Sequence, residues 1–230
     1  MKTQVCIIGG GPSGLLLGQL CHQAGIDAIV LERRSREHVL SRIRAGVLEQ
    51  GFIDLLKEAK VATRMDTQGY PHDGTVISFE DMEVRVDFRK HTGTSVMVYG
   101  QTEVTRDLYE ARDLTGGMTL HDVDEVELGN ATLDGDAGCT VSFTHEGQRK
   151  TIECDYIAGC DGFHGPSRQA IPAEKRREFE RVYPFGWLGI LSETPPAHHE
   201  LIYASSERGF ALCSMRNEKL SRYYLQAPLT

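Results

Sequence analysis

The sequence predicts a mixed α/β protein, in which a Rossmann-like βαβ domain is followed by a domain built around a β-sheet. A glycine-rich segment stands between a short apolar run and a helical pattern near the N-terminus, and short strands follow residue 178. At 230 residues, the chain has room for one large domain or two small ones. We expect residues 1–70 and 96–178 to form a discontinuous first domain, and residues 71–95 and 179–230 to form the second.

The composition is that of a globular protein, with 40% hydrophobic and 25% charged residues, which excludes a wholly disordered chain. A formal net charge of -8 argues against nucleic acid or an anionic membrane surface as the main partner. No apolar run approaches the roughly 18 residues of a membrane span, and the first run is too short for a signal peptide. The six cysteines have no metal-ligand spacing, so we expect reduced thiols, no metal and a cytoplasmic location.

The first βαβ unit carries a dinucleotide-binding pattern. An apolar run at residues 4–8 predicts a buried strand, and residues 15–24 give a helical apolar face that ends before Gly25. A second apolar run at residues 28–31 ends in Glu32, 18 residues beyond the last glycine of the pattern. The glycines of this G-x-G-x-x-G pattern are Gly9, Gly11 and Gly14.

Each part of this pattern has a chemical reason. Glycines let the backbone approach a pyrophosphate, the helix N-terminus supplies N–H donors, and the carboxylate of Glu32 accepts from ribose hydroxyls. The alternative is a glycine-rich turn without a ligand, with Glu32 as a solvated surface acid. Because strand, glycines, helix and acid occur in the right order, the ligand-binding interpretation is favoured.

A cluster of arginines follows this unit in an otherwise acidic chain. Such a cluster suits a diphosphate, because the arginine fork matches phosphate oxygens, although an ordinary solvated surface is the alternative for each residue. From residue 45 to 59 the apolar spacing predicts a helix with Gly51 as a weak point. The arginines are Arg33, Arg34, Arg36, Arg42 and Arg44.

The middle of the chain changes to strand patterns. Residues 83–88 alternate apolar and charged side chains, which predicts a half-buried antiparallel strand. Residues 101–114 return to a helical pattern, with Thr102 as its N-cap. Asp134-Gly135 and Glu146-Gly147 predict hairpin turns. The further expected strands are residues 75–79, 95–99, 118–121, 139–143, 151–154, 185–192, 199–204, 209–214 and 222–227.

A second glycine cluster, DYIAGCDGFH at residues 155–164, runs from an apolar strand into Gly-x-Asp-Gly. Ligands of open α/β sheets collect at the carboxyl ends of the strands, which makes Asp161 a candidate site residue. The alternative is a tight turn that uses Asp161 as a cap.

The chain resembles the N-terminal part of the para-hydroxybenzoate hydroxylase family, which are flavin-dependent aromatic monooxygenases. The resemblance rests on long ordered stretches such as RIRAGVLEQG at residues 42–51, YGQTEVTRDL at 99–108 and ERVYPFGWLG at 180–189, together with DYIAGCDGFH. These are more specific than a single glycine pattern. Further matching stretches are residues 7–9, 11–20, 210–214 and 221–224.

The resemblance implies an enzyme of aromatic catabolism that binds FAD and uses NADPH and O₂. The enzyme would hydroxylate para-hydroxybenzoate ortho to its phenol by way of a flavin hydroperoxide, giving protocatechuate. The first domain would then be the FAD-binding domain and the second would bind the substrate. Since the family's chain continues past Thr230, we expect little activity from residues 1–230 alone. We expect no nucleic-acid or membrane partner, and a homodimer as the assembly.

Carried over motif by motif, the resemblance also implies the site residues. Tyr203 would contact the substrate phenol, and His72 would be the solvent end of a proton relay; these two are the catalytic residues. The substrate would further be bound by Ser214, Met215, Arg216 and Tyr224, with the carboxylate on Ser214, Arg216 and Tyr224. FAD would contact Gly9, Gly11, Ser13, Gly14, Glu32, Arg42, Ile43, Arg44, Ala45, Gly46, Val47, Gln101, Asp161 and Arg222. NADPH would dock on Arg33, His38, Arg42, His164 and Arg168.

Other interpretations remain open. Tyr203, Tyr223 and Tyr224 on alternating strands could be core aromatics, and His72 a turn histidine. Ser214 and Arg216 are two residues apart, so on a regular strand they face the same side, as a shared carboxylate site requires.

Relatives often carry tyrosine at position 38 and glutamine at 34, but the positive charge here still favours the 2′-phosphate of NADPH. The competing functions are a plain NAD-dependent dehydrogenase, a non-catalytic FAD- or nucleotide-binding module, and a related FAD monooxygenase that acts on another phenol.

Overall fold

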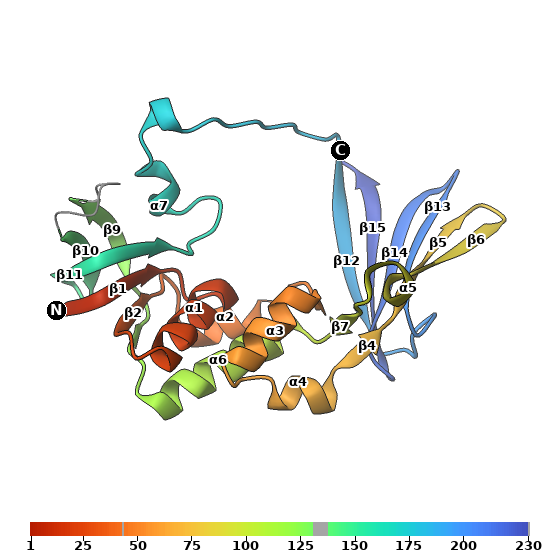
Figure 1. Cartoon of the computed structure of the whole chain (residues 1–230). Helices are drawn as coiled ribbons and strands as arrows, with labels where there is room; N and C mark the ends of the chain where they lie inside the picture. Colours follow the sequence, from red (N-terminus) through yellow and green to blue (C-terminus); the bar gives the residue numbers. More distant parts are fainter. Residues whose placement is uncertain (43, 131–137, 230) are drawn as a thin grey trace. The chain divides into compact units, whose positions relative to one another are not determined.

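The computed structural model describes residues 1–42, 44–130 and 138–229, and Figure 1 labels the helices and strands. The chain divides into two compact units. The first contains Met1–Arg44, Leu55–Ala62 and Gln101–Glu178, and the second contains Ala45–Asp54, Thr63–Gly100 and Phe179–Thr230. Residues 45–54, 63–70 and 96–100 pack with the second unit, whereas the sequence-based division put them in the first. The sequence-based assignment of an FAD-binding domain and a substrate domain stays a prediction.

The first unit is built on a six-stranded mixed sheet in the order β8-β2-β1-β11-β10-β9. β1 lies in the middle of a parallel set and pairs with both β2 and β11. β10 pairs antiparallel with β11 and β9, which makes this edge a meander. The strands are β1 (Lys2–Ile8), β2 (Ala28–Leu31), β8 (Thr119–Leu120), β9 (Asp124–Gly129), β10 (Cys139–His145) and β11 (Gln148–Gly159).

Two helices of this unit, α1 (Pro12–Gln23) and α6 (Gln101–Thr115), pack against each other. Arg112 of α6 is buried and ties the helix to the sheet edge, since its guanidinium donates to Thr119 Oγ1 at 3.1 Å and to the Met118 carbonyl at 2.8 Å. Tyr109 of α6 donates to the Gly10 carbonyl at 3.0 Å, which ties the helix to the glycine loop. Shorter helices are α2 (Arg36–Ser41), α7 (Pro166–Gln169) and a 3₁₀ turn η1 (Ala173–Lys175).

The second unit contains a six-stranded sheet in the order β12-β15-β14-β13-β5-β6 and a small sheet in the order β3-β7-β4. The four later strands pair antiparallel, with hairpins at β13–β14 and β14–β15 and with β12 beside β15. β13 adds in parallel to β5, so that segments far apart in the sequence share one sheet. The strands are β3 (Val47–Leu48), β4 (Tyr70–His72), β5 (Gly74–Phe79), β6 (Met82–Asp87), β7 (Val96–Val98), β12 (Phe185–Ser192), β13 (Leu201–Ser206), β14 (Gly209–Asn217) and β15 (Leu220–Pro228). The helices are α3 (Gln50–Glu58), α4 (Thr63–Gln68) and α5 (Phe88–Thr92). The second half of α3 belongs to the first unit.

The predicted fold class is confirmed, and several elements differ in detail. The helix expected over residues 45–59 was wrong at its start, because Val47 and Leu48 pair with Val98 and Met97 as β3, and the helix begins at Gln50. Thr102 is not an N-cap, since α6 begins one residue earlier. The Glu146-Gly147 turn is confirmed, with positive φ at both residues. The turn expected at Asp134-Gly135 lies outside the described residues.

The cysteines are free thiols, and burial raises the pKa of the Cys6 thiol to about 12. None of the helices in the described part of the chain is long and apolar enough to cross a membrane. Within the same residues, no group of histidine, cysteine and carboxylate side chains is arranged to hold a metal ion.

Candidate cofactor and substrate sites

The glycine loop between β1 and α1 is shaped by close backbone approaches. A Cβ at Gly14 would lie 1.9 Å from the Gly9 carbonyl oxygen, so only glycine fits where the helix meets the loop. Gly9 has a φ of +112°, and a Cβ there would lie 2.3 Å from the Cys160 carbonyl oxygen. At Gly11, by contrast, a Cβ would meet no atom within 4 Å, because this residue lines a cavity. Two glycines are therefore needed for packing, and the third keeps the cavity open.

The N-terminus of α1 is available for an anion. Gly11 is the N-cap residue, no side chain in the described part of the chain caps this end, and the first turn contains no acid. The N–H groups of a first helical turn lack partners within the helix, and the helix dipole places positive charge there. This end of α1 therefore offers the donor set that a diphosphate requires.

Glu32 is fixed at the carboxyl end of β2 by two backbone donors. Its Oε2 accepts from Gly10 N–H at 2.7 Å and its Oε1 accepts from Arg34 N–H at 2.8 Å. The carboxylate is thus held against the glycine loop, and each oxygen has a second lone pair. The expected ribose acceptor is in place beside the cavity.

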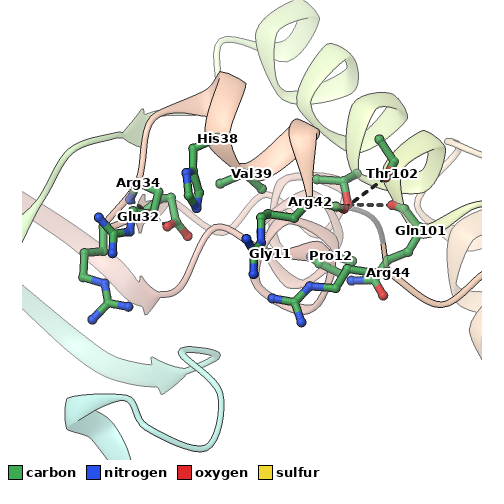
Figure 2. A pocket seen from close by; sticks show the side chains of 12 residues that line it. Gly11, Pro12, Glu32, Arg34, His38, Val39, Arg42, Arg44, Gln101 and Thr102 are labelled. Atoms are coloured by element: carbon green, nitrogen blue, oxygen red, sulfur yellow. Dashed lines mark hydrogen bonds between the residues drawn. The ribbon is translucent and has the colours of Figure 1, made fainter. Parts of the chain in front are cut away.

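The first cavity has a volume of about 600 Å³ and a strongly positive lining. Figure 2 shows the Arg42 and Arg44 side chains beside Gly11 and Pro12, with Arg34, Glu32 and His38 farther along the cavity. Thr102 donates to the Arg42 carbonyl at 3.3 Å and so ties the arginine segment to α6. The lining residues are Gly11, Pro12, Glu32, Arg33, Arg34, His38, Val39, Arg42, Arg44, Gln101, Thr102 and Thr105.

The arginine cluster seen in the sequence divides in the structure. Four of its five members line the first cavity. Arg36 does not, because it pairs with Asp113 at 2.6 Å and lies over the ring of Tyr109 at 4.8 Å. For Arg36 the structure supports a packing role, and for the other four it supports a place beside an anion.

A second cavity, of about 330 Å³, shares Glu32 and Arg33 with the first and includes the Gly-x-Asp-Gly junction. Asp161 lines it and accepts from Ser167 N–H at 2.9 Å, so this carboxylate also caps the turn into α7. His164 lines the same cavity. Arg168 lies outside both cavities: it is 4.1 Å from the ring centroid of Phe163 and pairs with Glu178 at 3.4 Å.

The other predicted FAD contacts fall into three groups. The Ser13 hydroxyl hydrogen-bonds the thiol of Cys160. Ala45, Gly46, Val47 and Arg222 belong to the second unit. Ile43 lies outside the described residues.

The predicted substrate residues gather on the large sheet of the second unit. Tyr203 pairs with Leu212, and Leu212 pairs with Tyr224, so these side chains form one row across β13, β14 and β15. Ser214 pairs with Arg222 in the adjacent row. Cross-strand neighbours share a face of a sheet, so a tyrosine-rich row lies next to a polar one.

Arg216 lies beside this group at an irregular point of the sheet. The β14–β15 register shifts between Met215 and Asn217, which places Arg216 at a β-bulge or similar irregularity. The alternation argument for Ser214 and Arg216 stays a prediction, because the strand register does not assign a face of the sheet to Arg216. Met215 is buried and its strand neighbour Ser214 is buried beside it, with the Ser214 hydroxyl donating to the Met215 carbonyl at 3.1 Å.

The local charges at Arg216 favour an anion. Burial lowers the pKa of Arg216, and the nearby charge of Arg222 lowers it further. The Arg222 guanidinium in turn lies 4.4 Å from the ring centroid of Tyr224. Two guanidinium groups that repel each other in a partly dry site are stabilised by a carboxylate that both can reach.

His72 is buried at the end of β4, and its Nε2 has no hydrogen-bond partner among the residues that the structure describes. Burial lowers its pKa, the carboxylate of Glu200 opposes this effect, and His199 and His198 add to it. Glu200 is itself buried and accepts from Arg85 through both oxygens at 2.7 Å. Sequence reasoning missed the Arg85–Glu200 pair, because the two residues are 115 positions apart and neither stands in a recognisable motif.

Comparison with known proteins identifies the family. A family described as the FAD binding domain matches residues 2–230. The chain belongs to this family. The glycine loop, Glu32 and the open cavity at Gly11 fit the diphosphate and ribose of that cofactor.

Relatives of known sequence agree with this family. The chain is 51% identical over 231 residues to p-hydroxybenzoate hydroxylase of Acinetobacter baylyi, covering 100% of this chain and 56% of that protein. It is 29% identical over 176 residues to the FAD-dependent monooxygenase dpmaE of Metarhizium anisopliae, covering 74% of this chain and 36% of that protein. The chain thus spans about half or less of the length of these relatives.

Solved structures of low sequence identity share the fold. Pseudomonas aeruginosa PqsL in complex with 2-aminobenzoylacetate matches with a TM-score of 0.84 at 16% identity, over 99% of this chain and 61% of that one. The p-nitrophenol 4-monooxygenase PnpA of Pseudomonas putida matches with a TM-score of 0.82 at 14% identity, over 99% and 58%. The fold is that of FAD-binding monooxygenases.

Replacing Glu32 by alanine is expected to weaken FAD binding about ten-fold or more. The change removes a charged acceptor for the ribose, worth about 1.5–3 kcal/mol, and also the acceptor of Gly10 N–H. The measurement is the FAD dissociation constant of the natural full-length protein, with Glu110→Ala, an exposed acid of α6, as the control. An unchanged dissociation constant in the Glu32 variant would overturn this placement of the ribose.

Proposed function

We propose that this protein is an FAD-dependent monooxygenase that hydroxylates para-hydroxybenzoate ortho to its phenol and forms protocatechuate. NADPH and O₂ are its co-substrates. The observation that carries the proposal is the 51% identity, over the whole chain, to a p-hydroxybenzoate hydroxylase. Residues of both units also support it.

The first unit holds FAD. The N-terminus of α1 and the arginines of the first cavity, above all Arg42 and Arg44, bind the diphosphate. Glu32 accepts from the ribose, and Gln101 lines the same cavity. When bound, reduced and supplied with O₂, this cofactor provides an electrophilic oxygen atom.

The second unit holds the substrate. A benzoate carboxylate needs a fixed cation, and Arg216 offers a planar two-point contact beside Arg222 and Ser214. Tyr203, in the adjacent row, accepts a hydrogen bond from the substrate phenol and donates one to the phenolate. The protein thereby favours the electron-rich form of the ring that an electrophilic oxygen attacks.

NADPH docks on the positive residues around both cavities. Arg33, His38 and Arg42 line the first cavity and His164 lines the second. Their charge and that of Arg34 suit a nicotinamide cofactor that carries a 2′-phosphate. Arg168 is the weakest member of this set, because Phe163 and Glu178 already engage its guanidinium.

The test is the visible spectrum of the purified natural full-length protein, with and without para-hydroxybenzoate, followed by product analysis per NADPH consumed. We expect a flavin spectrum that the aromatic acid perturbs, and protocatechuate in proportion to NADPH. A colourless protein would indicate a dehydrogenase instead. A flavoprotein that consumes no NADPH with any phenol would indicate a binding module, and turnover of another phenol alone would indicate a different monooxygenase.

Arg216→Lys is expected to weaken binding of para-hydroxybenzoate about ten-fold or more while FAD stays bound. Lysine keeps the charge but supplies a point contact in place of the planar fork. Binding of unsubstituted phenol should hardly change, since it has no carboxylate. Spectral titration of the bound flavin gives both constants, and Arg208→Lys in the exposed β13–β14 turn is the control. If acid and phenol lose affinity equally, Arg216 is a packing residue and the anchor lies elsewhere.

A further inference from the structure

Gly46 and Arg216 approach each other unusually closely within the second unit. A Cβ placed on Gly46 would lie 1.3 Å from Nη1 of Arg216 and 2.6 Å from its Cζ. The three atoms nearest to that position all belong to the same guanidinium group. The guanidinium therefore lies directly on the backbone of Gly46, in space that any side chain there would fill.

The backbone of Gly46 does not itself require glycine. Its φ is outside the positive range, so an alanine would be free of strain at this position. The nearest obstacle to a side chain is the end of the Arg216 side chain. This separates Gly46 from Gly14, where a backbone carbonyl excludes any Cβ.

The backbone under the guanidinium is held firmly. The Gly46 carbonyl accepts from Tyr99 N–H at 3.0 Å, and the next residue, Val47, begins β3 and pairs with Val98 of β7. Paired backbone moves less readily than the end of a long side chain. Gly46 is thus a fixed surface, and Arg216 is the movable partner.

We propose that Gly46 is a positioning residue for the substrate anchor. Because Gly46 has no side chain, the Arg216 guanidinium can lie against its backbone, and this contact fixes the orientation of the guanidinium plane. The inference rests on the proposed function, in which Arg216 binds the carboxylate of the substrate. A two-point contact to a carboxylate depends on the orientation of the fork, so a small displacement of the guanidinium removes it. Arg222 and Tyr224, which act electrostatically on Arg216, stand in the same group and leave it a limited choice of positions.

This role differs from a contact between the same segment and a cofactor. Arg44 lines the cavity at the glycine loop, and Gly46, two residues later, supports the arginine that binds the aromatic acid. One short segment therefore contributes to both sites through different residues. A substitution at Gly46, which is also a predicted FAD contact, is expected to weaken binding of the acid more than binding of the flavin.

The test is a double-mutant cycle in the natural full-length protein, with the variants Gly46→Ala, Arg216→Lys and the two combined. Spectral titration of the bound flavin gives the dissociation constants of para-hydroxybenzoate and of unsubstituted phenol. We expect Gly46→Ala to weaken binding of the acid about ten-fold, to change binding of phenol less than about two-fold, and to change the FAD dissociation constant less than that of the acid. In the Arg216→Lys background, which lacks the guanidinium, Gly46→Ala should have no further effect on the acid.

Two controls separate positioning from damage to the fold. Gly51→Ala, where a Cβ meets no atom within 4 Å, should bind acid and phenol as the unsubstituted protein does. The Arg216→Ala background removes the three atoms nearest to a Cβ at residue 46, so we expect Gly46→Ala to shift the melting temperature there by less than about 2 °C. A large shift in that background would mean that the backbone of residue 46 requires glycine, and would overturn the inference.

The remaining outcomes are also distinct. If the unsubstituted protein binds no aromatic acid, the proposed function fails, and the Gly46 inference fails with it. If that protein binds the acid but Gly46→Ala binds it equally well, the inference alone fails. Equal losses for acid and phenol, or full additivity with Arg216→Lys, would make Gly46 a packing residue and not a positioning residue.

Discussion

Alanine in place of Gly14 is expected to destabilise the first unit by about 3 kcal/mol or more and to abolish retention of FAD. The added Cβ would lie 1.9 Å from the Gly9 carbonyl oxygen and 3.1 Å from Ile7 of β1. Neither neighbour can yield, because β1 lies in the centre of the sheet and pairs on both sides. The loop must therefore move away from α1, which carries the donors for the diphosphate. The measurements are the urea midpoint and the flavin content of the purified variant.

Gly11→Ala is the matched comparison, because it adds the same methyl group three residues earlier. There the Cβ meets no protein atom within 4 Å, and φ is −77°, so stability should change by less than about 0.5 kcal/mol. FAD should nevertheless bind more weakly, since the methyl group enters the cavity. If the Gly14→Ala protein is stable and retains its flavin, the loop can accommodate a side chain at residue 14 and this prediction is wrong.

The sequence predicted the βαβ unit and the later hairpins well, because both are determined by residues close together in the chain. The glycine pattern and the Glu146-Gly147 turn act within a few residues. The strand expected at residues 185–192 was found with the same bounds. Local patterns of this kind need no knowledge of the rest of the molecule.

The predictions were wrong where residues far apart in the sequence determine the secondary structure. Val47 and Leu48 fit a helical spacing, but they pair with β7 as a strand. No local sequence pattern indicates that pairing. β9 was missed because its sequence, Asp124–Gly129, is rich in acids, as an edge strand exposed to water can be.

Residues of the candidate site were likewise predicted where a local motif determines them and missed where residues far apart in the sequence do. Glu32 and the cavity arginines were predicted from the motif, and the structure brings them together. A period-two argument also cannot predict the register shift at which Arg216 lies. The Arg85–Glu200 pair beside His72 joins β6 to the residue before β13, and only the tertiary fold brings these two segments together.

Tyr203→Phe is expected to leave FAD and substrate bound but to lower the yield of hydroxylated product per NADPH to a small fraction. A phenol ionises at about pH 10, and the un-ionised ring is a poor target for an electrophilic oxygen. Lowering the pKa of the substrate phenol by about two units takes about 2.7 kcal/mol, which one or two charge-assisted hydrogen bonds supply. Phenylalanine keeps the ring of residue 203 and removes this hydrogen bond.

His72 stands at the other end of the proposed proton path. Tyr203 pairs with Ile77 of β5, five residues along the chain from His72, a separation of about 16 Å if the chain is extended. The proposed path therefore needs an intermediate group between the two side chains, with His72 as the proton acceptor. Among the described residues its Nε2 has no hydrogen-bond partner, and burial lowers its pKa, which favours the neutral form that can take a proton. His72→Asn should slow the substrate-stimulated oxidation of NADPH with less loss of product yield than Tyr203→Phe.

The measurement is protocatechuate formed per NADPH consumed, with hydrogen peroxide assayed in parallel. In the coupled reaction one oxygen atom of O₂ enters the ring and the other leaves as water, with the two electrons of NADPH. Without ring activation the same two electrons reduce O₂ to hydrogen peroxide, so peroxide should account for the missing product in Tyr203→Phe. Tyr156→Phe, on an exposed tyrosine of β11, is the control and should stay coupled. A fully coupled Tyr203→Phe enzyme would mean that activation of the phenol does not pass through this residue.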